Sequence, residues 1–216
     1  MKRKTRQRLI CIFTAVFLLT VFPSCGGEKV KEYPAIERVG GESYNVFSAG
    51  EGNTPRFSFE YPAAYELIEY NSMPENLSTN VRMSRSSLEE AREGYIKLIE
   101  IHIDKHSGSA EIKLNERVDE HKSVVSAGTA RDLRLAEKIS IVFSGIKGWE
   151  IVISKTSLPF PPAPLVNKPT PTMSREIFFD YQGMVWRISL FSDLATYEQA
   201  EADFEHVLGT FVIEDE

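Results

Sequence analysis

The strongest constraint on the fold of this chain is a series of short segments in which apolar and polar residues alternate. Residues 56–61 read RFSFEY, which places three aromatic side chains on one face of a strand and polar groups on the other. Residues 95–104 read YIKLIEIHID and place Ile99, Ile101 and Ile103 on one face in the same way. Such alternation is typical of a sheet that buries one face and leaves the other in water.

Further strands are expected at residues 65–70, 138–144 and 149–155, and in a hairpin over 175–191. The second and third of these flank residues 145–148, a turn of hairpin type, and the last hairpin folds back at Gln182–Gly183. Helical spacing predicts helices over 110–125 and from a capping box at Thr196–Gln199 to a C-terminal cap at Gly209, with a short one over 88–93 capped by Ser87. Strands in series with few helices predict an α+β fold, an antiparallel sheet covered by helices.

The N-terminus has the pattern of an export signal. Residues 1–8 are basic and carry no acid, and residues 9–22 form an apolar run of about fourteen residues. A membrane-spanning helix needs roughly twenty, so this run is too short to cross as a helix. The following residues 22–27, FPSCGG, resemble a lipobox, which predicts a signal peptide over 1–24 and lipid on Cys25. The alternative is an ordinary secreted protein with a free cysteine beside the cut.

Cysteine content and charge exclude several functions for the mature chain. The two cysteines are Cys11, inside the signal, and Cys25. A lipidated mature chain therefore has no thiol, which excludes disulfides, thiolate metal sites and cysteine nucleophiles. Loss of the five basic residues of the signal lowers the net charge from −6 to about −11. Such a charge argues against binding nucleic acid and against lying flat on anionic lipid, so the lipid on Cys25 is expected to hold the protein to its membrane, outside the cytoplasm.

The mature chain divides into a tether and one domain. Residues 25–43 are polar and glycine-rich and predict a flexible tether, and residues 44–216 are long enough for one domain with a sizeable core. A loop around Pro159 to Pro164 contains two overlapping P-x-x-P patterns, which favour polyproline II. Two interpretations of this loop stay open: contact with an unknown protein partner, or a passive linker that protects a sheet edge.

One local pattern suggests chemistry. His102, Asp104 and His106 are spaced by two, so a strand would point them the same way, as metal ligands would point. No fourth ligand is identifiable and Lys105 is a poor neighbour for a cation, so no metal and no cofactor is expected. The chain also lacks a G-x-S-x-G elbow, a glycine-rich phosphate loop and an H-E-x-x-H helix, so no catalytic residue is assigned. His121 and His206 are expected at the surface or boundary of helices.

Several framework residues together resemble PsbP-like domains. They are Phe57–Pro62 followed by Tyr65, Gly148–Trp149, the strand 184–188 reading MVWRI, and Leu208–Phe211 at the end. The resemblance covers about residues 47–213 and implies an α/β/α sandwich with a central antiparallel sheet. Known members are mostly binding or assembly factors: extrinsic subunits of photosystem II, a Ran GTPase-binding factor and bacterial lipoproteins. No functional residue is carried over, because nothing here matches a binding motif of the family.

The expected function is therefore a non-enzymatic binding or scaffold domain on the outer side of a membrane. The alternative is a carrier that holds a lipid or small apolar ligand in a cavity, and an enzyme built on the histidine-aspartate strand comes third. A large enclosed apolar pocket favours the carrier, and a filled core with an exposed patch favours the scaffold. Converging side chains of His102, Asp104 and His106 would favour the metal site or the enzyme.

Overall fold

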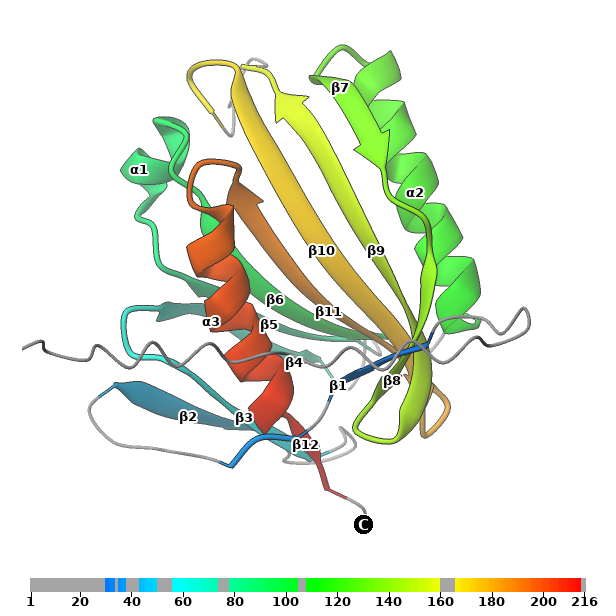
Figure 1. Cartoon of the computed structure of the whole chain (residues 1–216). Helices are drawn as coiled ribbons and strands as arrows, with labels where there is room; N and C mark the ends of the chain where they lie inside the picture. The colour runs from blue at the N-terminus through cyan, green and yellow to red at the C-terminus, as the bar shows by residue number, and fades with distance from the viewer. Residues whose placement is uncertain are drawn as a thin grey trace, which may run out of the picture.

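The computed structural model describes residues 30–33, 35–37, 43–49, 56–73, 78–104, 108–159 and 166–214 (Figure 1). The two ends of the chain and the short stretches between these ranges are not described. Among the described residues, no helix is long and apolar enough to span a membrane. Cys25, His106 and most of the proline-rich loop lie outside these ranges.

A large twisted sheet forms the centre of the domain (Figure 1). Its strands follow the order β1-β8-β9-β10-β11-β6-β5-β4, and β7 also pairs with β9. The strands are β1 (Val30–Tyr33), β4 (Glu66–Met73), β5 (Ser78–Ser84), β6 (Lys97–Asp104), β7 (Ala130–Leu135), β8 (Ile139–Phe143), β9 (Ile146–Ser157), β10 (Thr170–Tyr181) and β11 (Met184–Asp193). A smaller sheet has the order β12-β3-β2, with β2 (Tyr44–Ala49), β3 (Phe57–Pro62) and β12 (Val212–Ile213). The helices are α1 (Leu88–Arg92), α2 (Ala110–Ser126) and α3 (Tyr197–Thr210).

The α+β class expected from the sequence is confirmed, and its layers differ from a simple sandwich. Helix α3 and the small sheet together cover one face of the large sheet, which we call the packed face, and α3 crosses it in Figure 1. Helix α2 packs on the opposite face against β9, β10 and β11, and it reaches β6 through an ion pair between Lys113 and Asp104. We call this second face the groove face. The expectation of an antiparallel sheet also needs a correction, because β1 pairs with β8 in parallel.

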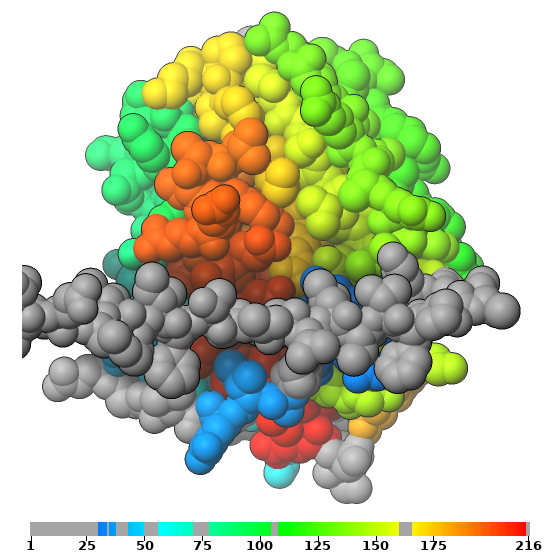
Figure 2. Space-filling model, viewed as in Figure 1, coloured from blue at the N-terminus to red at the C-terminus, as the bar shows by residue number. Residues whose placement is uncertain are grey.

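Aromatic rings fill the interior between the sheet and the layer of α3. The ring of Phe211 lies 5.6 Å from those of Phe57, Phe59 and Phe143, measured between centroids, and Trp186 packs edge-on against Phe57. Phe204 of α3 is fully buried, as its place on the apolar stripe predicts. On this face the atoms of α3 adjoin those of the neighbouring strands (Figure 2). These rings pack closely against one another, which favours a scaffold over a carrier with a cavity among them.

Part of the stretch that the sequence assigns to the tether is ordered in the structure. Strand β1 pairs with β8, and the side chain of Tyr33 is buried beside Glu150 and Arg175, to which its hydroxyl is hydrogen bonded. Further along, the backbone N–H of Ile36 donates to the carbonyl of Gly209 at 2.7 Å. The composition of this stretch is polar, so its few anchoring side chains gave no periodic signal.

Four local expectations about turns and caps can be compared with the structure. The turn between β8 and β9 lies at Ser144–Gly145, both with positive φ, so it is tighter than the expected 145–148 loop. The capping box at Thr196 does not form, because the carboxylate of Asp193 accepts the hydrogen bonds from the backbone N–H and hydroxyl of Thr196. Gly209 does not end α3 but lies inside it, where a Cβ atom would come within 2.7 Å of Ile36. By contrast, the cap of α1 at Ser87 is confirmed, with Glu90 completing a capping box.

Candidate binding groove

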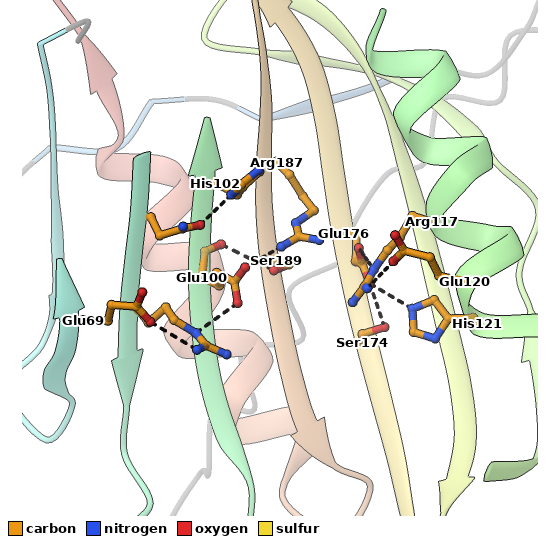
Figure 3. Close-up of polar contacts among 12 residues, drawn as sticks. Glu69, Glu100, His102, Arg117, Glu120, His121, Ser174, Glu176, Arg187 and Ser189 are labelled. Carbon is orange, nitrogen blue, oxygen red and sulfur yellow. Dashed lines mark hydrogen bonds and ion pairs between the residues drawn. The ribbon is translucent and has the colours of Figure 1, made fainter. Parts of the chain in front are cut away.

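A wide hollow lies on the groove face, between α1 and α2. Its volume is about 730 Å³, within the range typical of small-molecule sites. Side chains of β4, β5, β6, β11, β10 and β9 line it, together with residues of both helices. Figure 3 shows the polar residues on its floor and on the wall formed by α2.

Register places a row of polar residues across the floor of this groove. Glu69, Arg82, Glu100, Ser189 and Glu176 occupy matched positions on β4, β5, β6, β11 and β10. Because paired residues of neighbouring strands share a face, all five belong to the groove face. The row is visible in Figure 3, running from Glu69 to Glu176.

Opposite charges alternate along this row. Arg82 lies 3.2 Å from Glu69 (Nη1 to Oε2) and 3.2 Å from Glu100 (Nε to Oε2). Arg187, which points from β11 toward the same carboxylate, donates from Nη2 to Glu100. A carboxylate held by two guanidinium groups is fixed in place, so this end of the groove is preorganised.

Glu176 lies at the centre of a second cluster, which α2 joins through Arg117 and His121. Its carboxylate accepts hydrogen bonds from Arg117 Nε at 3.1 and 3.2 Å, from Ser174 Oγ at 3.3 Å and from His121 Nε2 at 3.3 Å. Burial alone would raise its pKa, but the hydrogen bond from His121 and the charge of Arg117 outweigh burial and lower the pKa of Glu176 to about 2. At neutral pH this carboxylate is therefore ionised.

Lys155 on β9 is the last member of this cluster and contacts His121 of α2. Its amine lies 3.1 Å from Nδ1 of His121. A neutral imidazole that accepts there carries its proton on Nε2 and donates to Glu176, so one tautomer satisfies both contacts. Burial and the nearby charge of Arg117 lower the pKa of Lys155. Among the described residues, no carboxylate forms an ion pair with this amine.

The end of the groove beside α1 is apolar. Leu98 and Phe191, at paired positions on β6 and β11, are partly buried on its floor. Ile68 on β4 and Leu88 on α1 form its far wall, with 55% and 65% of their surfaces exposed. Exposed apolar side chains gathered at one hollow are a feature of binding sites.

A smaller hollow of about 140 Å³ adjoins the large one and contains His102 and Asp104. Arg117 and Arg187 line both hollows and so stand between them. The ring of His102 is bonded through Nδ1 to the amide oxygen of Asn80, and burial followed by the charge of Arg187 lowers its pKa. The lowered pKa keeps this imidazole neutral, whereas the nearby charges of Arg187 and Lys113 oppose binding of a further cation.

The metal pattern seen in the sequence is only partly described. His102 and Asp104 do share one face, as their spacing predicts, whereas His106 lies outside the described residues. Within the described ranges, no group of three His, Cys, Asp or Glu side chains is placed to hold a metal ion. The expectation of no metal at these residues stays a prediction.

Sequence reasoning missed the residues that form the groove. His121, expected at a helix surface or boundary, is 4% exposed and hydrogen bonded on both ring nitrogens. A signal for Arg187 was present, because it interrupts an apolar stretch of β11, and Glu176 stands next to the apolar run 177–179 of β10. Their ion-pair partners, however, lie far away in the chain and cannot be found from local spacing.

This arrangement does not favour catalysis. A general base works best when its pKa is near the operating pH. Ser174 is hydrogen bonded to Glu176, but a carboxylate with a pKa of about 2 is too weak a base to activate a hydroxyl at neutral pH. The carboxylates of the groove floor therefore fix arginines in place, which suits binding.

No protein-family model matches this chain, and no curated protein matches it either. Solved structures do match. The solution structure of cyanobacterial PsbP (CyanoP) from Synechocystis sp. PCC 6803 shares 13% identity, covering 83% of this chain and 98% of that chain, with a TM-score of 0.48. The Ran-binding protein Mog1p of Saccharomyces cerevisiae shares 9% identity, covering 80% and 97%, with a TM-score of 0.44.

LpqN of Mycobacterium tuberculosis, which is involved in cell envelope biogenesis, shares 7% identity, covering 80% of this chain and 92% of that chain, with a TM-score of 0.39. PsbP and a Ran-binding protein are among the kinds of protein that the sequence resemblance named. At these identities the likeness says nothing of function.

Proposed function

We propose that this protein is a lipid-anchored, extracytoplasmic binding module without enzymatic activity, and that it binds its ligand or partner in the groove between α1 and α2. The observation that carries the proposal is the groove itself, a preformed hollow of about 730 Å³ on the groove face of the sheet. Paired arginines and glutamates hold its charged floor, and exposed apolar side chains form one end. This combination of apolar surface with a few fixed polar groups is typical of ligand sites.

The proposed location of this module outside the cytoplasm is based on the N-terminal sequence. A basic start, an apolar run too short to span a membrane and the cysteine after Ser24 support export and lipid attachment at Cys25. The mature chain is acidic, so the acyl chains rather than the surface of the domain would hold it at the membrane. The proline-rich loop around Pro159 to Pro164 is proposed as a second place where a protein partner would bind.

A carrier function is the second candidate, and the groove is the feature that favours it. The aromatic rings of the core pack closely against one another, so a carried ligand would lie in the open groove rather than among them. Leu98 and Phe191 would then contact its apolar part.

Blocking the groove tests this proposal. Ser189 lies on the groove floor and is partly exposed, so Ser189→Trp places an indole in the hollow without removing a charge. Lys147→Trp, at an exposed position of β9 outside the groove, is the matched control. Each protein is extracted from its native membrane, and everything that co-purifies is identified by native mass spectrometry.

The expected result is a component that co-purifies with the wild type and with Lys147→Trp and is lost from Ser189→Trp. A wild-type protein that carries nothing, or a Ser189→Trp variant that keeps the same component in the same amount, would refute the proposal. Melting temperatures of the three proteins are compared to ensure that each is folded.

A further inference from the structure

The residues that line the large hollow include more basic than acidic ones, although the chain as a whole is acidic. Five basic residues line the large hollow, against three acidic ones. The basic residues are Arg82, Lys97, Arg117, Lys155 and Arg187, and the acids are Glu66, Glu100 and Glu176. Glu69 and Glu120, beside the hollow, also pair with Arg82 and Arg117. The two lysines are the basic lining residues that form no ion pair with an acid among the described residues, and their charge favours negatively charged ligands.

Two of these acids are already fully engaged. Glu100 is shared by Arg82 and Arg187, and Glu176 by Arg117 and His121. The charge of Glu176 still acts on Lys155 and partly offsets the lowering of its pKa, but neither carboxylate forms an ion pair with this amine, which contacts the imidazole of His121.

The position of Lys155 beside Arg117 identifies where an anion would lie. The two cations repel each other in a partly buried site, and this repulsion adds to burial in lowering the pKa of Lys155. A negatively charged group between them would remove the repulsion and accept hydrogen bonds from both side chains. Both residues line the large hollow, so a ligand lying in the groove reaches them.

The apolar end of the groove sets the second requirement. Leu98 and Phe191 continue the floor from the cluster of Lys155 toward α1, where Leu88 is 65% exposed. An apolar group lying there would remove these side chains from water, at about 25 cal/mol per Å² of apolar surface buried.

We propose that the groove binds a small amphipathic anion, with its charged head between Lys155 and Arg117 and its apolar tail over Phe191 and Leu98 toward Leu88. This inference rests on the proposed function and gives it a ligand class. Such a groove selects its ligand by the charge of the head and by the apolar tail together, because the two sites lie at different ends of one hollow.

Calorimetric titration of the full chain held in nanodiscs, with empty nanodiscs as the blank, tests the proposal. The probes are octyl phosphate, octyltrimethylammonium with the same tail and the opposite charge, and inorganic phosphate with no tail. The variants are Lys155→Met, which removes the unpaired cation, and Leu88→Ser, which removes an exposed apolar contact. Lys147→Met, at the exposed position on the same strand, is the control.

Octyl phosphate is expected to bind, and the other two probes are not. Lys155→Met should weaken its binding about tenfold or more, because a hydrogen bond to a charged group is lost. Leu88→Ser should weaken it about fivefold, because apolar burial is reduced, and Lys147→Met should leave the affinity unchanged.

Three results would overturn the inference: no binding of octyl phosphate, equal binding of the cationic probe, or an affinity that neither Lys155→Met nor Leu88→Ser changes. The two experiments together distinguish a wrong ligand class from a wrong proposed function. If Ser189→Trp still abolishes co-purification while octyl phosphate does not bind, the groove is a binding site for another class of ligand. If both experiments fail, the groove is not the binding site.

Discussion

Arg175 on β10 and Glu150 on β9 form an ion pair inside the packed face, with Nε and Oε1 3.0 Å apart and both side chains almost inaccessible to water. The hydroxyl of Tyr33 joins them, so that β1 is held to the sheet through this pair. On its other side, Arg175 reaches Glu201 and Glu205 of α3. The pair therefore connects the first strand, the sheet and the last helix.

Removing one member of this pair is expected to be costly. Glu150→Ala leaves a buried guanidinium without its main partner, which should lower the free energy of unfolding by about 3–5 kcal/mol. Urea unfolding of Glu150→Ala, Arg175→Met and the double variant measures this. The double variant should lose clearly less than the sum of the two, and an additive result would show that the two residues do not interact.

The second prediction about stability concerns Phe204. It is fully buried on α3, and the guanidinium of Arg175 lies 5.7 Å from its ring centroid. Phe204→Ala should lower the free energy of unfolding by about 3–5 kcal/mol, as for other core aromatics. Leu194→Ala is the control, because Leu194 is half exposed and its loss should change stability by less than about 0.5 kcal/mol. A melting temperature of Phe204→Ala equal to that of the wild type would contradict this packing.

Glu176 predicts how the stability of the domain depends on pH. Its pKa falls from 4.5 in the unfolded chain to about 2 in the folded protein, so the folded state favours the ionised form. The stability that it contributes is present above about pH 4.5 and is lost as the pH falls toward 2. Glu176→Gln should therefore show a weaker loss of stability over this window in acid unfolding followed by circular dichroism. Glu198→Gln, an exposed residue of α3, should behave as the wild type does, and an unchanged acid profile of Glu176→Gln would contradict the assignment.

Lipid attachment is predicted at Cys25. The variant Cys25→Ala should yield a soluble or uncleaved product, because the thiol that would carry the lipid is missing. Metabolic labelling with a fatty-acid analogue compares the two proteins. Equal label on the wild type and the variant would contradict the lipoprotein interpretation.

Local sequence patterns predicted the elements whose burial is one-sided and regular. The alternation of Ile99, Ile101 and Ile103 predicted β6, and the apolar stripe through Phe204 predicted the buried side of α3. Strand β5 was missed because only Val81 and Met83 alternate within a polar stretch. Strand β1 was missed because four residues give no periodicity, and its contact partners lie more than a hundred residues later.

The groove could not be predicted in the same way, because its contacts are long-range. Arg117 and Glu176 lie 59 positions apart, and their meeting depends on which side of α2 rests on β10. The charge of Arg187 within an apolar stretch, and that of Glu176 beside one, were the available signal. A buried charge requires a partner, so such interruptions predict that a partner exists without naming it.

The central claim, that the groove is occupied in the native setting, can be measured by lysine acetylation. The full chain is labelled in its native membrane and, in parallel, in nanodiscs of one synthetic zwitterionic lipid, and acetylation of Lys155 and Lys147 is quantified by mass spectrometry. Lys155 lines the groove and Lys147 is exposed outside it. We predict slower acetylation of Lys155 in the native membrane than in the nanodiscs, with equal rates for Lys147. Equal rates for Lys155 in both settings would contradict the account.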